Sequence, residues 1–145
     1  MADTEQPLES ATEWVREHVQ RYVETKGEEG HVWRGVPTLL LTTRGRKSGQ
    51  LRRQALIYGQ DGEGTYVIVG SKGGSETHPL WYLNLRADPT VHLQVGAEVF
   101  DATARTAEGE ERERLWQMMA GIFPMYNEYR QKTKREIPVV VLRRV

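Results

Sequence analysis

The sequence contains no cysteine, and none of its apolar runs approaches the roughly 20 residues that a membrane-spanning helix needs. The absence of cysteine excludes disulfide bridges, thiolate metal sites and a cysteine nucleophile. The first ten residues are acidic and polar and lack the blocks of a secretion signal, which predicts a cytoplasmic protein. No metal site is expected, because the histidines lack the close spacing of a zinc-binding helix; they are His18, His31, His78 and His92.

Acidic side chains are also absent from residues 31–60, although the chain of 145 residues has a formal net charge of zero. This stretch carries six basic residues, whereas residues 1–29 carry eight acidic and three basic ones. Five of the six basic residues fall within TTRGRKSGQLRRQALIY, residues 42–58. Such a run is usually a solvated face, but here one turn could gather the charges around an anionic ligand. A nucleic acid is disfavoured, because the acidic amino-terminal region would repel a long polyanion.

Short β-forming runs separated by glycine turns dominate the chain from Pro37 onward. Several linkers are short enough for antiparallel hairpins, and the strands do not alternate regularly with helices. The pattern predicts a mainly β (α+β) fold with an antiparallel barrel, and it argues against a doubly wound Rossmann sheet. The six predicted strands cover residues 38–43, 51–59, 65–70, 91–95, 98–106 and 137–145.

An amphipathic helix is predicted over residues 8–26, with Ser10 or Thr12 as its amino-terminal cap. Its apolar face could pack on the core, cover a substrate cleft or rest on a lipid surface; its acidic opposite face argues against anionic lipid. Two further helical pieces are predicted at residues 78–89 and 108–123. The apolar face of the first helix comprises Trp14, Val15, His18, Val19, Tyr22 and Val23.

The loop RGRKSGQ, between the first two predicted strands, has the composition of an anion site. Gly45 and Gly49 permit turns in which successive amide N–H groups point into one concavity. Arg46, Lys47 and the Ser48 hydroxyl would surround that concavity, and arginine adds a bidentate fork for phosphate or carboxylate. The two arginines of the following strand point to opposite faces, so at most one can face the same ligand. The spacing is not that of a Walker loop.

Two further segments could contribute to a site. A strand that ends in SKGG exposes backbone amides and Lys72, and its glycines let a flat ligand approach the main chain. The helix that follows adds free amides at its start and places Trp81 and Asn84 on one face. Near the carboxyl end, Tyr126 and Tyr129 are three residues apart and could offer hydroxyl donors to a pocket. Each of these residues could instead belong to an ordinary turn or core.

Taken in order, LLLTTRGRKSGQ, SKGGSETHPLWYLNL, DPTVHLQVG, EERERLW, FPMYNEYRQKT and REIPVVVL resemble the deazaflavin (coenzyme F420)-dependent nitroreductase and quinone reductase family of actinobacteria. The likeness runs from about Pro37 to residue 145. It implies an FMN-binding-like split β-barrel of about six antiparallel strands, with an amino-terminal helix and two to three short helices. The implied organisation is an amphipathic helix and linker at residues 1–30, followed by a cofactor-binding barrel at residues 31–145.

The resemblance also implies which residues bind the coenzyme. Those that would hold its phosphate and oligoglutamate tail and line the cofactor groove are Arg46, Lys47, Ser48, Arg52, Arg53, Gln54, Ala55, Leu56 and Ile57. Those beneath the ring and at the helix start that closes the site are Val69, Gly70, Ser71, Lys72, Leu80, Trp81 and Asn84. Tyr126 would contact both the ring and the acceptor, and the catalytic candidates are Tyr126, Ser71 and Tyr129. At Ile57 and Phe123 the sequence departs from relatives that carry tyrosine.

The function implied by the resemblance is that of an F420H2-dependent reductase, which transfers a hydride from C5 of the deazaflavin to a quinone or a nitroaromatic compound. The coenzyme would carry the chemistry, and the protein would bind, orient and stabilise charge. The proton that follows the hydride could come from Tyr126 or from water. Two alternatives remain open: an FMN-binding oxidoreductase of the same fold, and a non-catalytic ligand-binding member. Contact with the inner face of the membrane and the oligomeric state also remain open.

Overall fold

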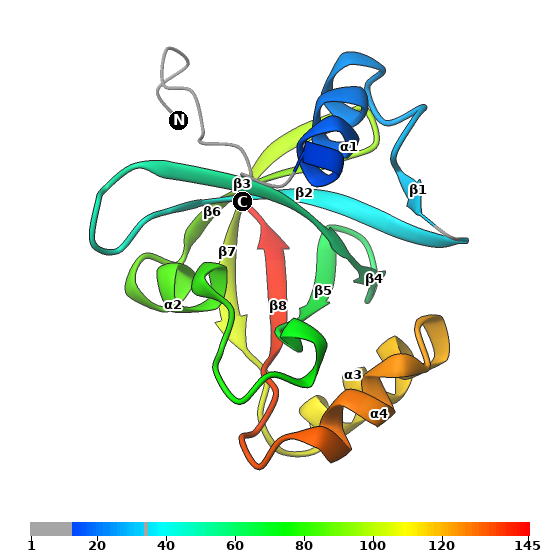
Figure 1. Ribbon diagram of the computed structural model, residues 1–145, viewed down its shortest axis with the longest axis vertical. Coiled ribbons are helices and arrows are strands. Elements are labelled where there is room, and N and C mark those ends of the chain that lie inside the picture. The colour runs from blue at the N-terminus through cyan, green and yellow to red at the C-terminus, as the bar shows by residue number, and fades with distance from the viewer. Residues whose placement is uncertain (1–12, 34) are drawn as a thin grey trace.

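The computed structural model describes residues 13–33 and 35–145, with side chains from residue 16 onward. Within this part of the chain, an eight-stranded antiparallel sheet curls into a half-barrel (Figure 1). The predicted mainly β split barrel is therefore confirmed. The six longer strands are β2 (Val36–Arg44), β3 (Leu51–Ile57), β5 (Thr65–Val69), β6 (Thr90–Val95), β7 (Glu98–Thr106) and β8 (Val139–Arg144). Two short strands that the sequence did not predict are β1 (Val32–Trp33) and β4 (Gly59–Gln60).

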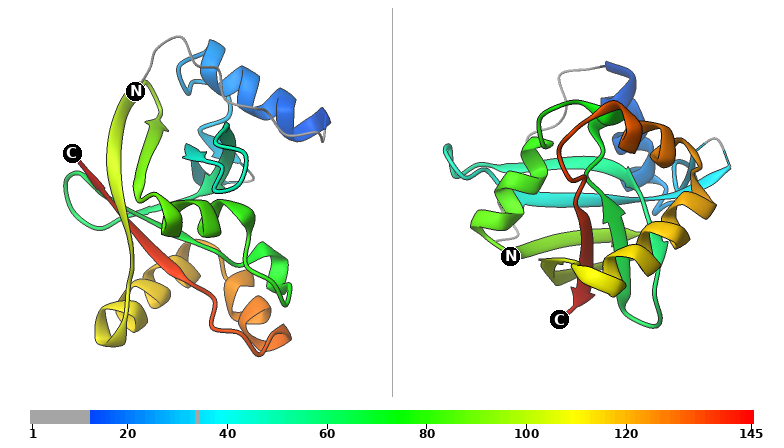
Figure 2. Two further views of the ribbon diagram at one scale, coloured as in Figure 1. Left: turned by 90° about the vertical axis from the view of Figure 1, so that its left-hand side faces the viewer. Right: turned by 90° about the horizontal axis from the view of Figure 1, so that it is seen from below.

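The strands follow the order β1-β2-β6-β7-β8-β5-β4, and β3 pairs with β2 outside this path. The last strand, β8, lies between β7 and β5, where Leu142 pairs with both Ala104 and Tyr66. The predicted hairpin between β2 and β3 forms, and its loop is closed by hydrogen bonds from Gly45 N–H to Gln50 O and from Gly49 N–H to Gly45 O. This arrangement projects the basic loop from the end of two long strands (Figure 2).

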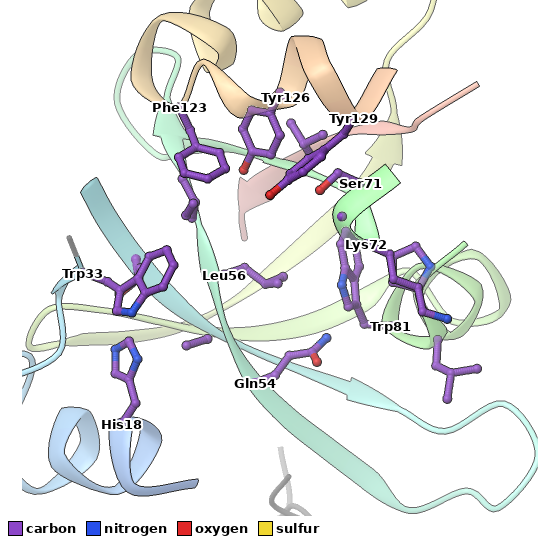
Figure 3. A pocket seen from close by; sticks show the side chains of 17 residues that line it. His18, Trp33, Gln54, Leu56, Ser71, Lys72, Trp81, Phe123, Tyr126 and Tyr129 are labelled. Atoms are coloured by element: carbon purple, nitrogen blue, oxygen red, sulfur yellow. The ribbon is translucent and has the colours of Figure 1, made fainter. Parts of the chain in front are cut away.

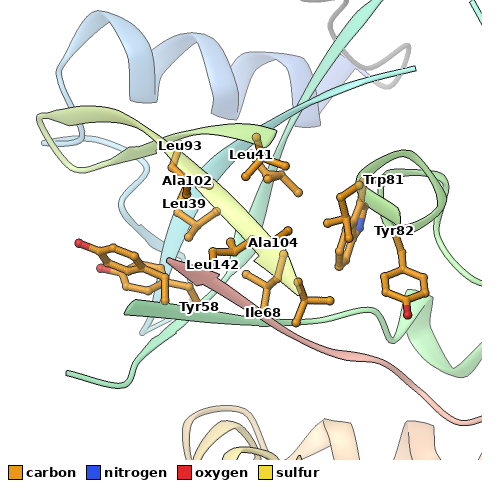
Figure 4. Close-up of a cluster of buried hydrophobic side chains, with 14 of the residues drawn as sticks. Leu39, Leu41, Tyr58, Ile68, Trp81, Tyr82, Leu93, Ala102, Ala104 and Leu142 are labelled. Carbon is orange, nitrogen blue, oxygen red and sulfur yellow. The ribbon is translucent and has the colours of Figure 1, made fainter. Parts of the chain in front are cut away.

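The core occupies the inside of the curled sheet (Figure 4). Ile68 of β5 and Val140 of β8 are fully buried there, between the strands and α2 (Leu80–Ala87). Their neighbours Val67 and Val141 point to the opposite face and are buried beneath α3 (Gly109–Ile122). Because both faces of β5 and β8 are covered, these strands are continuous apolar runs rather than alternating ones.

Four helices and one short 3-10 turn, η1 (Lys72–Gly74), accompany the sheet in the described residues. The predicted helix at 108–123 corresponds to α3, and the one at 78–89 corresponds to α2, whose first turn follows Pro79. The remaining helix, α4 (Met125–Lys132), begins after Pro124 and was not predicted as a separate element. It crosses α3 at the edge of the half-barrel (Figure 1). No helix in the described part of the chain is long and apolar enough to cross a membrane.

The amino-terminal helix is described as α1 (Glu13–Glu24), and residues 8–12, which include the predicted caps, lie outside the described residues. Of its predicted apolar face, Val19 and Tyr22 are fully buried and Val23 is 37% exposed. The Tyr22 hydroxyl donates to Thr38 O (2.9 Å) and accepts from Gly96 N–H (2.7 Å), and burial raises the pKa of Tyr22 to about 12. Core packing is therefore the role of this face, at least through these two residues. The side chains of Trp14 and Val15 lie outside the described residues.

Candidate active site

A pocket of about 560 Å3 opens between β3, the residues after β5, the start of α2 and the corner between α3 and α4 (Figure 3). Its volume lies in the range of small-molecule sites, about 300–1,000 Å3. No acidic side chain is among the described residues that line it. These residues are His18, Trp33, Thr38, Gln54, Ala55, Leu56, Ile57, Val69, Ser71, Lys72, Gly73, Pro79, Leu80, Trp81, Phe123, Tyr126 and Tyr129.

One wall of the pocket is the edge of β3. Four consecutive residues, Gln54–Ile57, line the pocket, although alternate residues of a strand point to opposite faces. The strand must therefore present its edge to the cavity. Among the described strands β3 pairs only with β2, which leaves the N–H and C=O groups of its other edge for a ligand. A flat, hydrogen-bonding ring system could bind along this edge.

The segment after β5 forms a second wall. Its main chain turns through Lys72 (φ +46°), Gly73 (φ +64°) and Gly74 (φ +83°), a conformation that only glycine adopts readily. A side chain at Gly74 would be strained, because φ is +83° and a Cβ there would lie 3.0 Å from Tyr129 O of α4. The Lys72 ammonium donates to the Thr77 hydroxyl at 3.2 Å. The Ser71 side chain is 9% exposed and lines the cavity close to Lys72 (Figure 3).

Three aromatic rings from the α3–α4 corner form the third wall. The ring centroid of Tyr126 lies 5.1 Å from that of Phe123 and 6.4 Å from that of Tyr129. Behind them Trp116 donates its indole N–H to Asn127 Oδ1 at 2.9 Å, which fixes α4 on α3. Burial, and secondarily the neighbouring Tyr129, raises the pKa of Tyr126 above its ordinary value. The Tyr126 hydroxyl, which points into the pocket in Figure 3, therefore keeps its proton and can donate a hydrogen bond.

The basic hairpin lies beside this pocket and does not line it. The side chains of Arg46, Lys47 and Ser48 are exposed to solvent. Asn84 of α2 anchors the loop: its Oδ1 accepts the Arg46 backbone N–H at 3.1 Å, and its Nδ2 donates to the Thr43 hydroxyl at 3.2 Å. One turn earlier in the same helix, Leu80 and Trp81 line the pocket. The single short helix α2 thus contacts both the hairpin and the pocket and fixes their relative position.

The predicted site residues fall into two groups. Those that the structure brings together around the pocket are Gln54, Ala55, Leu56, Ile57, Val69, Ser71, Lys72, Leu80, Trp81, Tyr126 and Tyr129. Those that do not line it are Arg46, Lys47, Ser48, Arg52, Arg53, Gly70 and Asn84. The individual roles of both groups remain predictions.

Three members of the second group have a clear structural reason for their position. The buried amide of Asn84 faces the hairpin rather than the cavity, whereas Trp81 of the same helix lines the cavity. Gly70 is packed so closely that an added Cβ would lie 2.7 Å from Pro138 Cγ. Arg52 belongs to the first part of β3, which leaves the loop before the strand reaches the pocket at Gln54.

Sequence reasoning did not assign several lining residues to the site, although it noted the SKGG glycines and the departure at Phe123; they are His18, Trp33, Thr38, Gly73, Pro79 and Phe123. His18 lies on the predicted apolar face of α1, but nothing local indicates that this face reaches a cavity. Trp33 belongs to a two-residue strand whose pairing with β2 no local pattern reveals. Phe123 ends α3, and only the turn into α4 directs it toward the pocket.

Comparison with known structures gives the class of fold. The heme storage protein HutZ of Vibrio cholerae superposes with a TM-score of 0.59 at 18% identity, over 87% of this chain and 89% of that one. At this identity the likeness shows the fold alone. The chain is therefore a split-barrel protein, of the fold that flavin- and heme-binding proteins share.

Three more similar proteins narrow the class. A structure described as an F420-H2 dependent reductase (FDR-A) is 46% identical, with a TM-score of 0.67 over 77% of this chain and 97% of its own. A structure described as a domain-swapped dimer is 44% identical, with a TM-score of 0.70 over 92% and 99% of the two chains. An F420H2-dependent quinone reductase of Mycobacterium tuberculosis is 42% identical over 134 residues, 90% of this chain and 89% of the relative.

The family model described as F420H(2)-dependent quinone reductase matches residues 14–144. The chain belongs to the F420H2-dependent quinone reductase family, so it is an oxidoreductase whose cofactor is coenzyme F420. The residues present fit this coenzyme. The free edge of β3 and the apolar walls suit a flat ring, and the exposed Arg46 and Lys47 suit an anionic tail.

Proposed function

We propose that the pocket brings the deazaflavin ring of reduced F420 and a quinone acceptor together, while the basic hairpin binds the phosphate and glutamates of the coenzyme tail. The observation that carries this proposal is the anchoring of the hairpin to α2. Because Asn84 holds the Arg46 main chain and the first turn of the same helix lines the pocket, cations and cavity have a fixed relative position. A ligand with a flat ring and a long anionic tail matches that layout.

The coenzyme supplies the hydride, from C5 of its ring, and the protein supplies position and electrostatics. The free edge of β3 at Gln54–Ile57 would hydrogen-bond the polar edge of the ring. Val69 and Leu56 would pack against the ring and exclude water from it. The lack of acidic side chains around the cavity favours a ligand that carries negative charge.

Tyr126 and Ser71 are the donors that we assign to the acceptor. Reduction of a quinone places negative charge on its oxygen, and a preorganised donor at that point stabilises the charge. The Tyr126 hydroxyl is suited to this role because burial keeps it protonated, and Ser71 offers a second hydroxyl from the adjoining wall after β5. Tyr129 packs against Tyr126 and would hold its ring in place.

The proposal is tested first by titrating the purified protein with F420 and, separately, with FMN. Trp33 and Trp81 line the pocket, so their fluorescence reports occupancy. We expect quenching by F420 at micromolar concentration or below and no saturable quenching by FMN. Preference for FMN would contradict the coenzyme assignment, and binding of neither would leave a ligand-binding protein of the same fold.

The acceptor is tested by following oxidation of F420H2 with menadione and with a nitroaromatic compound in parallel. We expect turnover of the quinone. Turnover of the nitro compound alone would overturn the quinone assignment while keeping the coenzyme. Both acceptors are compared at equal concentration in one buffer.

A cytoplasmic location at the inner face of the membrane is part of the proposal, because quinones with long apolar tails reside in the bilayer. Leu80, which lines the pocket, is 69% exposed, and Met125, next to Tyr126, is 39% exposed. These side chains would give lipid an apolar contact beside the site. Cosedimentation with lipid vesicles tests this point, and failure to sediment would restrict the acceptors to quinones dissolved in water.

A further inference from the structure

The segment Gly70–His78 has little regular structure of its own. Three successive residues of it have positive φ, and Lys72 adopts that conformation (φ +46°) without being glycine. Its internal backbone hydrogen bonds are those from Gly74 N–H to Ser71 O (2.9 Å) and from Ser75 N–H to Lys72 O (3.1 Å). Yet this segment presents Ser71, Lys72 and Gly73 to the pocket. An external group must therefore hold it in shape.

Arg135, in the connection between α4 and β8, is that group. Its Nε donates to Ser75 O at 2.7 Å, Nη1 donates to Gly70 O at 3.1 Å, and Nη2 donates to Ser71 O at 2.8 Å. Nη1 also lies 3.1 Å from His78 Nδ1. One planar guanidinium thus donates hydrogen bonds to three carbonyls and one imidazole of a segment about 60 residues earlier in the chain. No carboxylate pairs with Arg135 among the described residues, and the hydrogen-bond partners of its guanidinium all belong to the segment.

We propose that Arg135 is a positioning residue for the reductase: it holds residues 70–78 in the conformation that the coenzyme ring requires, and it releases them when His78 gains a proton. The second half of the proposal rests on the hydrogen-bond pattern. Arginine can only donate, so His78 Nδ1 must accept, and the imidazole must be neutral. A protonated His78 would place a second cation against the guanidinium and remove one of its four acceptors. The link to coenzyme binding rests on the proposed function, but the hold on the segment does not.

The groups that face His78 all oppose its protonation or are neutral. Arg135 faces it from the carboxyl-terminal side, and Arg86 and Tyr82 face it from α2, with the Tyr82 ring centroid 5.0 Å away. Burial, followed by Arg135 and Arg86, lowers the pKa of His78 below its usual value of 6.5. Arg135 therefore keeps its hydrogen bond to His78 above about pH 6.5. It loses this acceptor as the pH falls below that value toward the lower pKa of His78 in the folded state.

The first test compares Arg135→Gln with Lys134→Gln, which removes the same charge from the neighbouring, exposed residue. In Arg135→Gln the amides of Gly74 and Ser75 should exchange hydrogen about tenfold faster, and the Kd for F420 should rise about tenfold. Turnover at saturating coenzyme should change by less than about threefold, because the bound ring restores the segment. Arg135→Lys should be intermediate, since its three donors cannot reproduce the fork. Lys134→Gln should match the wild type in each measurement.

The second test concerns pH. His78→Asn keeps an acceptor near the position of Nδ1 but does not titrate, and His92→Asn, at a residue that does not line the pocket, is its control. Between pH 8 and pH 5, F420 should bind progressively more weakly to the wild type and to His92→Asn than to His78→Asn. Titration of the coenzyme itself cancels in this comparison. His78→Lys should bind weakly at every pH.

The outcomes distinguish the role of Arg135 in ordering residues 70–78 from the role of that segment in coenzyme binding. Unchanged exchange of Gly74 and Ser75 in Arg135→Gln would overturn the hold itself, whatever the coenzyme does. Faster exchange with an unchanged Kd for F420 would show that the segment does not position the coenzyme. If the wild type does not bind F420, the proposed function fails, and the exchange data still decide whether Arg135 orders the segment. Parallel pH curves for wild type and His78→Asn would remove His78 from the proposal.

Discussion

The basic hairpin and the aromatic pocket, the two parts of the proposed site, are built in opposite ways. The hairpin offers exposed cations on a loop, whereas the pocket encloses Tyr126 at 5% exposure and Trp81 at 7%. Exposed charges act over several ångströms and are weakened by salt, but buried contacts depend on shape and tolerate no displacement. The comparison leads us to expect that affinity for the coenzyme and alignment of the reaction reside in different residues.

The largest effect is expected on the hairpin side. Arg46→Ala with Lys47→Ala removes two charge-assisted contacts, each worth about 1.5–3 kcal/mol, so F420 should bind on the order of a hundredfold or more weakly. Each single variant should lose part of this affinity, and higher salt should narrow the difference from wild type. Fluorescence titration measures the Kd. Arg143→Ala, which removes an exposed cation from β8, is the control. Wild-type affinity in the double variant would contradict the assignment of the tail to the hairpin.

On the pocket side, Tyr126→Phe should have the reverse pattern. Coenzyme affinity should remain nearly unchanged, while turnover of quinone should fall on the order of tenfold to a hundredfold because a donor to the acceptor oxygen is lost. Steady-state oxidation of F420H2 with menadione measures this. Tyr129→Phe, on the same helix, is the matched control and should have the smaller effect. Equal turnover in Tyr126→Phe and wild type would remove the hydroxyl from the acceptor side.

The helix that joins the two parts gives the third prediction. Asn84→Ala should lower the free energy of unfolding by about 1–2 kcal/mol, because the Thr43 hydroxyl and the Arg46 N–H lose their partner. It should also weaken F420 binding without a change in the charge of the hairpin. Asn84→Asp, which keeps the acceptor for Arg46 N–H, should preserve more of the affinity. Chemical denaturation and titration check both effects, and identical binding by all three proteins would contradict the anchoring.

The smallest effect is expected at the far end of the pocket. His18 donates its Nε2–H to Gly30 O at 2.8 Å, and its ring lines the cavity. His18→Ala should change the KM for quinone by a few-fold, on the order of 1 kcal/mol or less, and leave the Kd for F420 unchanged. Glu17→Ala, an exposed neighbour on α1, is the control. A large loss of coenzyme affinity in His18→Ala would place the ring, rather than the acceptor, at this end.

The two parts of the site also differ in what sequence could predict. Charge segregation, glycine spacing and strand periodicity are local, so the hairpin with Arg46 and Lys47 could be located and formed as predicted. The same holds for the six longer strands and for Ser71 and Lys72 at the end of β5. The resemblance supplied the identity of the ligand, with its ring and anionic tail. It also assigned the tyrosines to the site, whereas the residues alone could have placed them in the core or in a pocket.

The remaining features depend on contacts between distant segments. Trp33 joins the pocket through a two-residue strand, and the position of α4 depends on the hydrogen bond from Trp116 of α3 to Asn127. Asn84 is a residue type that often contacts ligands, but its partners are Thr43 of β2 and Arg46 of the basic loop, about 40 residues earlier in the chain. No pattern in the sequence pointed to Arg135, because three of its partners are backbone carbonyls and the fourth, His78, lies 57 residues away. Non-local hydrogen bonds are the part of a site that periodicity cannot reveal.

The position of β8 between β7 and β5 also governs how the chain can be made. During synthesis β5 emerges early, and apart from the two residues of β4 its partner in the sheet is β8, about 70 residues later. The apolar strand β5 therefore keeps an open edge while three helices and two further strands are translated, which is the situation in which nascent chains aggregate or recruit chaperones. Production of this protein should thus respond to translation speed and chaperone supply more than its size would lead one to expect.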